Sequence, residues 1–158
     1  MNMLLEELAV SLPDARETVR IIVRLVAALL AGGIIGFQRE ASGKAAGLRT
    51  HILVCMGTAL FVLAASGSDM QQDAMSRVVQ GLATGIGFLG AGAILKLESS
   101  RRIRGLTTAA GIWLTAALGV AIGLGQLGTA AIGTAFAWVV LAVLIKLEKR
   151  IGSSIDAA

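Results

Sequence analysis

The sequence predicts an all-α membrane protein with five transmembrane helices. The chain of 158 residues is 56% hydrophobic and only 15% charged, and its mean hydropathy is +0.81. Soluble domains carry about 25% charged residues. The charges are also segregated, which leaves apolar runs long enough to cross the hydrocarbon of a bilayer. We therefore expect a transmembrane domain over residues 20–150, after an N-terminal interfacial segment (1–19) and before a C-terminal tail (151–158).

The first two predicted spans cover Ile21–Phe37 and Leu48–Ala65. Leucines at spacings of three and four before Pro13 suit a short interfacial helix, although a frayed terminus fits equally well. Arg24 lies near the start of the first span, where its long stem can reach the headgroups. Gly32 and Gly36 form a small-xxx-small face, the pattern by which membrane helices approach closely.

The third predicted span, Val78–Leu97, is unusually rich in glycine. Close helix packing at Gly81, Gly85 and Gly90 would explain this richness, and a broken helix is the alternative. Two further spans are predicted at Leu106–Leu124 and Thr129–Leu147, joined by a very short turn.

The distribution of Lys and Arg predicts the orientation of these spans. Ten fall on one side and four on the other. The ten are Arg39, Lys44, Arg49, Lys96, Arg101, Arg102, Arg104, Lys146, Lys149 and Arg150, and the four are Arg16, Arg20, Arg24 and Arg77. The positive-inside rule then places the N-terminus outside and the C-terminus in the cytoplasm. Because the basic residues lie in loops and aromatic residues are few, we expect no nucleic-acid partner.

A weak internal repeat relates the first two spans to the next two. Sliding the chain by 58 residues gives nine identities in 31 positions, among them Gly32 with Gly90 and Glu40 with Glu98. The repeat would make the two helical hairpins parallel copies related by an axis along the membrane normal. Similar chemistry at two helix starts would also explain the identities.

The two predicted cytoplasmic turns gather the residues suited to an anion. Helix starts expose free N–H groups and a partial positive charge, and both turns are rich in cations. The candidates for binding phosphate or an acidic lipid head are Arg39, Lys44, Arg49, Thr50, Arg104 and Thr108. Topology signalling with general lipid contact is the alternative for the same residues.

A second set of polar residues lies where the apolar runs meet the headgroups. Gln38, Glu40, His51 and Glu98 are candidates for a gate or for a structural lock between the hairpins. We expect an ion pair between Glu40 and either Arg39 or a basic residue of the other turn. His51 could sense acid or could be a hydrogen-bonded structural residue.

Other chemistry has little support in the sequence. Asp69 and Asp73, four residues apart on a predicted external turn, could weakly hold a hydrated Mg²⁺, although a solvated loop explains them better. The lone Cys55 fits a small buried apolar residue. A GxGxxG pattern at Gly85–Gly90 lies inside a predicted span, where a dinucleotide site is excluded by context. We expect no enzyme activity and no cofactor.

Four stretches together resemble the MgtC/SapB family of membrane proteins. They are Gly36–Glu40, Gly43–His51, Gly85–Gly92 and Arg104–Ala110 with Trp113. The resemblance covers about Arg20–Leu124 and implies a multi-pass bacterial inner-membrane protein linked to growth at low Mg²⁺, acid stress or life in a host cell. Gln38 stands where many members carry an acid, and we expect a short form of the family without the soluble C-terminal domain of longer members.

Two functions remain open at this point. One is a membrane regulator of magnesium, and possibly phosphate, homeostasis that acts by helix contact with another membrane protein. The other is a small homo-oligomeric transporter or channel, a dimer for example, for Mg²⁺ or an anion such as phosphate. The lipid bilayer is the expected surrounding in both.

Overall fold

The computed structural model describes residues 13–66, 72–97 and 102–155. The described chain contains the helices α2 (Ala15–Ala41), α3 (Leu48–Ser66), α4 (Gln72–Gly92), α5 (Leu106–Gly123) and α6 (Leu127–Ile155). Two short strands, β1 (Leu95–Leu97) and β2 (Arg102–Arg104), pair between α4 and α5. The fold is therefore helical, as predicted. The leucines of the predicted interfacial segment lie outside the described residues.

The helix bounds follow the apolar runs closely in α3 and α5 and less closely elsewhere. Helix α2 begins at Ala15, where the side chain of Asp14 accepts a hydrogen bond from the backbone of Glu17, so residues 15–19 belong to the first long helix. Helix α6 remains helical to Ile155, inside the segment predicted as a tail. Helical structure therefore extends beyond the predicted spans at both ends of the chain.

The predicted third span was wrong at its C-terminal end. Helix α4 is continuous but stops at Gly92, and the residues up to Leu97 form β1 instead. Leu95 pairs with Arg104 and Leu97 with Arg102 in an antiparallel hairpin. At its base, Gly105 has a φ of +97° and lies so close to the Ala93 carbonyl that no Cβ would fit.

Within the described ranges, three helices are long and apolar enough to cross a membrane by length and composition: α2, α3 and α5. The apolar part of α6 among residues whose surroundings are described, Leu127–Val143, is shorter. Helix α4 is not among the three, because Asp73, Arg77 and Gln80 interrupt its first half. The membrane character of the chain is thus supported, whereas the count of five spans is not established by these criteria.

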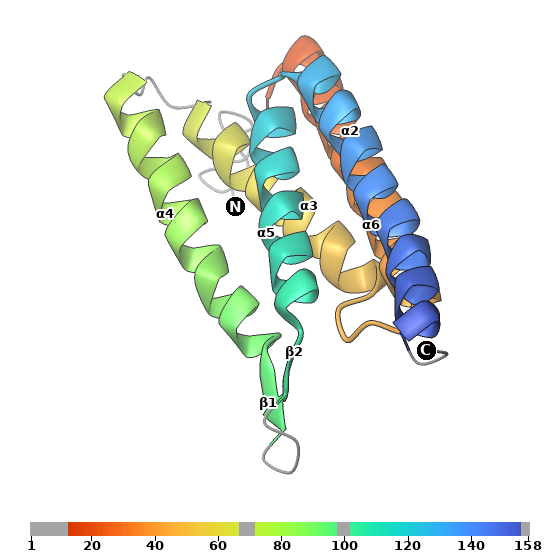
Figure 1. The fold of residues 1–158 in the computed structure, drawn as a ribbon. Helices are drawn as coiled ribbons and strands as arrows, with labels where there is room; N and C mark the ends of the chain where they lie inside the picture. The colour runs from red at the N-terminus through yellow and green to blue at the C-terminus, as the bar shows by residue number, and fades with distance from the viewer. Residues whose placement is uncertain (1–12, 67–71, 98–101, 156–158) are drawn as a thin grey trace, which may run out of the picture.

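Both predicted cytoplasmic turns lie at one end of the bundle. Figure 1 shows the α2–α3 connection, the β1–β2 hairpin and the C-terminal end of α6 together at the bottom. The α5–α6 turn lies at the opposite end (Figure 1). We refer to the end with the hairpin as the loop end.

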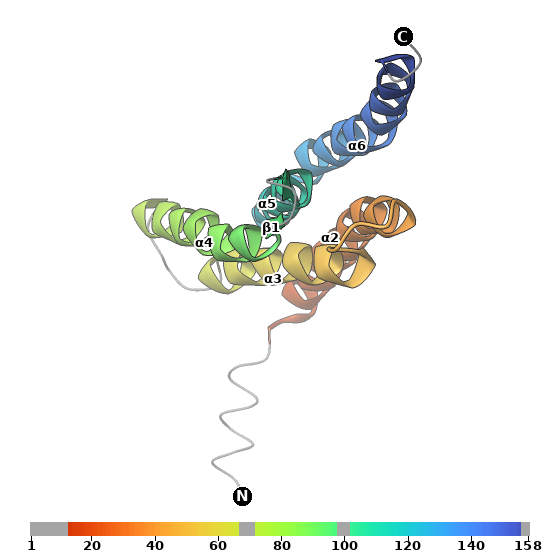
Figure 2. The same cartoon turned by 60° about the horizontal axis from the view of Figure 1, so that its bottom comes forward.

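Small side chains build the centre of the bundle. The main apolar cluster includes Ala28 and Ile35 of α2, Ala59 of α3, and Ile122 of α5. Helix α5 contacts all four other helices, whereas α6 packs against α2 and α5. Figure 2 shows α6 and α4 extending to opposite sides of this centre. Residues that contact α5 can therefore connect the other helices to one another.

Candidate functional site

Arg39 is the largest fully buried side chain of the described protein. It belongs to the last turn of α2, and its Nη2 donates a hydrogen bond of 3.1 Å to Oγ1 of Thr108 in the first turn of α5. Its Nε and Nη1 have no hydrogen-bond partner among the described residues. Arg39 is buried because the C-terminal turn of α2 faces α5.

His51 lies in the same region and is also fully buried. Its Nδ1 donates to the carbonyl of Gly47 over 2.9 Å, and because a carbonyl only accepts, this nitrogen carries the proton. Nε2 has no partner in the described chain. A Cβ at Gly111 of α5 would lie 3.5 Å from Nε2, so the imidazole fills the space beside α5.

Glu40 does not pair with a cation of the described chain. Its Oε2 accepts a hydrogen bond of 2.7 Å from the backbone N–H of Leu48, at the first residue of α3. A Cβ at Gly47 would approach this oxygen to 2.6 Å. Glu40 therefore caps α3 within its own hairpin, and the expected ion pair to Arg39 is absent. Glu98 lies outside the described residues.

Gln38 joins α2 to α6 at the loop end. Its Nε2 donates to the Leu141 carbonyl over 2.8 Å and to Ser42 Oγ over 3.2 Å. Its Oε1 is buried without a described partner. The gate or lock residues are thus separated in space: Gln38 contacts α6, Glu40 caps α3, and His51 faces α5.

Arg24 makes a contact that the sequence analysis missed. Its Nη1 donates to the Gly123 carbonyl at the C-terminal end of α5 over 2.6 Å. This carbonyl is one of those that the helix itself leaves unpaired, and a cation is favourable there. An interfacial anchor was the sequence-based explanation of Arg24, since nothing local indicates that α2 passes this end of α5.

The predicted anion-binding residues divide into a buried pair and an exposed group. Arg39 and Thr108 are in contact. Lys44, Arg49, Thr50 and Arg104 are exposed at the loop end, and no hydrogen bond among the described residues joins their side chains to the buried pair. The exposed group is placed to meet lipid headgroups or solutes, and the buried pair is not part of that surface.

The predicted packing glycines differ sharply in their surroundings. A Cβ at Gly32 would lie 2.7 Å from the His51 carbonyl oxygen, and one at Gly36 would lie 2.7 Å from Leu48 Cα. Both glycines therefore allow close contact of α2 with the α3 backbone. At Gly90 a Cβ would make an ordinary contact of 3.7 Å with Ala109.

Gly81 and Gly85 do not pack against a helix of the described chain. A Cβ at either would meet no atom within 4 Å, so the expectation of close packing there was wrong. They instead line an apolar groove of about 630 Å³ between α3 and α4. Two glycines of α5 that we did not single out, Gly119 and Gly123, take the tight contacts with α3.

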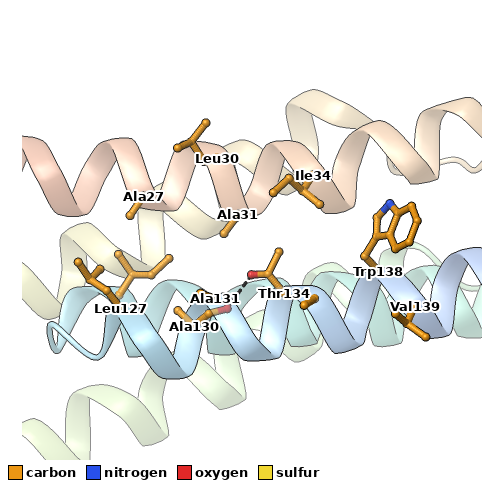
Figure 3. A pocket seen from close by; sticks show the side chains of 12 residues that line it. Ala27, Leu30, Ala31, Ile34, Leu127, Ala130, Ala131, Thr134, Trp138 and Val139 are labelled. Carbon is orange, nitrogen blue, oxygen red and sulfur yellow. Dashed lines mark hydrogen bonds between the residues drawn. The ribbon is translucent and has the colours of Figure 1, made fainter.

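A second apolar groove separates α2 from α6. It measures about 570 Å³ and is lined mainly by Ala, Leu, Ile and Val, with Trp138 at one edge (Figure 3). Thr134, its one lining hydroxyl, donates to the Ala130 carbonyl of its own helix over 2.8 Å. Walls of this kind suit acyl chains or apolar side chains and offer a hydrated ion nothing to bind.

A metal centre has no support in the described part of the chain. No group of three His, Cys, Asp or Glu gathers there. Asp73 is exposed in the first turn of α4, and Asp69 lies outside the described residues. The weak metal site predicted for these two acids stays a prediction. Cys55 is buried and free.

Comparison with known proteins identifies the family. The model of the MgtC family matches residues 25–150. The chain belongs to the MgtC family. The match begins within α2 and ends within α6, so Arg39, His51 and Thr108 all lie in the part shared with the MgtC family.

Named relatives of this MgtC family member are similar over most of its length. It is 45% identical over 137 residues to protein SrpB of Synechococcus elongatus, covering 80% of this chain and 75% of SrpB. It is 41% identical over 141 residues to the putative magnesium transporter YhiD of Escherichia coli K12, covering 85% of this chain and 65% of YhiD.

Protein MgtC of Salmonella typhimurium is 42% identical over 113 residues, which are 72% of this chain and 47% of that protein. The aligned part thus spans less than two thirds of YhiD and about half of MgtC. No solved structure matches.

Proposed function

We propose that this MgtC family member is a multi-pass protein of the bacterial inner membrane that regulates magnesium homeostasis, and possibly phosphate homeostasis, through contacts with a partner membrane protein. Family membership and the name of the relative YhiD support the link to magnesium. Five spans, an outside N-terminus and a cytoplasmic loop end belong to this proposal. The distribution of Lys and Arg supports that orientation.

The observation that carries the choice of a regulator is that the buried hydroxyls away from the loop end are engaged within their own helices. The buried hydroxyls of Thr58, Thr115 and Thr134 each donate to a carbonyl of their own helix. Each of these hydroxyls therefore uses its one donor hydrogen within its own helix. A path for Mg²⁺ needs oxygen ligands or room for retained waters, and the described interior of one chain offers no such row.

The exposed cations of the loop end extend the proposal to the membrane surface. Lys44, Arg49 and Arg104 are exposed there. Each basic residue near an anionic leaflet contributes about 1 kcal/mol of attraction. We propose that these residues hold the loop end against acidic lipids while the apolar helix faces remain free for a partner helix.

Reconstitution tests the regulator against the transporter. The purified protein in liposomes should move no more Mg²⁺ or phosphate than empty liposomes, while expression in a strain lacking its own family member should restore growth at low Mg²⁺. Pull-down from that strain should recover a membrane partner. Flux that scales with protein would contradict the regulator, and an inactive, unfolded preparation is excluded by a cooperative melting curve.

The alternative function is a homo-oligomeric transporter or channel, a dimer being the simplest case. The observation favouring it is the open α3–α4 groove, where Gly81 and Gly85 leave the surface of α4 free for a second copy. Cysteines placed at Gly81 and Gly85 in a Cys55→Ala background should then crosslink between copies. Absence of crosslinks together with absence of flux would remove this alternative.

A labelling experiment tests the orientation that both functions assume. Lys44→Cys and Arg104→Cys, in the Cys55→Ala background, place one thiol on each of the two connections at the loop end. A membrane-impermeant maleimide should label both in inverted vesicles and neither in intact cells. Labelling of the two positions from opposite sides would overturn the arrangement.

A further inference from the structure

The first turn of α5 is uncapped, unlike that of α3. Its N-cap residue is Gly105, which has no side chain to accept a hydrogen bond, whereas Glu40 fills that role for α3. The first N–H groups of a helix have no partner within it. At α5 the backbone N–H groups of Leu106, Thr107 and Thr108 therefore face outward with no partner among the described residues, and the helix dipole adds positive potential there.

The side chain that reaches this turn is a buried cation with free donors. Arg39 is 0% exposed and touches the turn through Thr108 Oγ1, yet its Nε and Nη1 are unpartnered in the described chain. A buried charge without a counter-ion is strongly destabilising, by several kcal/mol for an ion in a protein interior. Glu40, the nearest acid in sequence, is occupied with α3.

We propose that the Arg39 guanidinium and the first turn of α5 together bind one phosphate group. The planar guanidinium presents its N–H donors in a fork that matches phosphate oxygens, and the helix start supplies N–H groups to the remaining oxygens. The group comes either from inorganic phosphate or from the head of an acidic lipid. Lys44, Arg49 and Arg104 are exposed at the same end of the bundle.

This inference deepens the anion binding proposed for the loop end but does not depend on how the protein acts on magnesium. Binding is measured on the isolated protein, so a failure of the regulator hypothesis leaves the result unaffected. The site also assigns different roles to the cations: Arg39 is the ligand, and the exposed basic residues attract the anion without holding it.

Thermal unfolding in detergent tests the site with inorganic phosphate. At constant ionic strength balanced by NaCl, the Tm should rise by roughly 3 to 6 °C for each tenfold increase in phosphate beyond saturation. Arg39→Gln should abolish this dependence. Arg77→Gln, which removes an exposed cation from the first half of α4, should retain it. Equal loss in both variants would contradict a specific site.

Lipid exchange followed by native mass spectrometry identifies the source of the phosphate group. Protein passed through phosphatidylglycerol vesicles should retain one lipid per chain if the headgroup is the ligand, and Arg39→Gln should lose it. Phosphatidylcholine vesicles are the control for acyl-chain binding. If the protein retains neither lipid but its Tm still rises with phosphate concentration, the ligand is the free anion.

Three further variants give the test a second readout. If Arg39→Gln does not fold, Thr108→Val and Arg39→Lys report on the same site, the first by losing the contact and the second by keeping charge without the fork. Glu98→Gln tests whether that carboxylate is the counter-ion. If Glu98→Gln destabilises the protein as much as Arg39→Gln does, and neither phosphate nor phosphatidylglycerol has any effect, the proposal is overturned.

Discussion

Two adjacent glycines of α2 should respond in opposite ways to the same substitution. At Gly32 an added Cβ would lie 2.7 Å from the His51 carbonyl oxygen and 2.9 Å from Ile52 Cα. At Gly33 the nearest atoms would be the side-chain tip of Ile52 at 3.9 and 4.0 Å. The first contact is with backbone and is too short, whereas the second is an ordinary van der Waals contact.

The difference between the two variants isolates the packing energy. Each Gly→Ala change gains about 1 kcal/mol of helix propensity, and this gain cancels when the variants are compared. Overpacking of a rigid contact costs about 1–3 kcal/mol. We therefore expect Gly33→Ala to equal or exceed the wild-type stability and Gly32→Ala to fall below Gly33→Ala by about 1–3 kcal/mol.

Thermal unfolding in one detergent measures both variants under identical conditions. Each kcal/mol corresponds to roughly 2 to 4 °C in Tm for a chain of this size. Ile52→Ala should not rescue Gly32→Ala, because the obstructing atoms belong to the backbone. Equal melting temperatures for Gly32→Ala and Gly33→Ala, or a rescue by Ile52→Ala, would refute the close α2–α3 contact.

Three other substitutions test contacts at α5 and α3, each by its change in Tm. Gly119→Ala should destabilise by about 1–3 kcal/mol, because a Cβ there collides with the Cys55 carbonyl; an unchanged Tm would contradict the α3–α5 packing. Gly105→Ala should be still more harmful, because φ is +97° and a carbonyl occupies the Cβ position, while Gly92→Ala, which meets no atom within 4 Å, serves as its tolerated control. Glu40→Ala should cost about 1 kcal/mol by uncapping α3, and a stability equal to wild type would argue against the cap.

The extent of the helices was predictable because it depends on local composition. Apolar runs indicated α3 and α5 almost to the residue, and the spacing of Gly32 and Gly36 indicated the face of α2 that touches α3. Similar glycine spacing at Gly81 and Gly85 was misleading. Spacing shows that a helix can approach closely, but only the arrangement of the bundle decides whether a neighbour is present.

The site was less predictable than the fold because its contacts join distant parts of the chain. The sequence indicated Arg39 as a candidate, but its burial depends on α5, 69 residues away from it at Thr108. The role of Arg24 depends on α5 in the same way. The β1–β2 hairpin was missed because Leu95 and Leu97 continue the apolar run of α4, and length alone cannot separate a helix end from a short strand.

The last turn of α2 explains how one binding event could affect the whole bundle. Three consecutive residues there contact three different helices: Gln38 reaches α6, Arg39 reaches α5, and Glu40 caps α3. Successive residues of an α-helix point about 100° apart, so one turn can serve three neighbours at once. Any shift of this turn must therefore alter its contacts with α3, α5 and α6 together. A phosphate group held by Arg39 would act on the one turn that is tied to all three helices, which is the property a membrane regulator needs if its apolar outer faces are to signal to a partner.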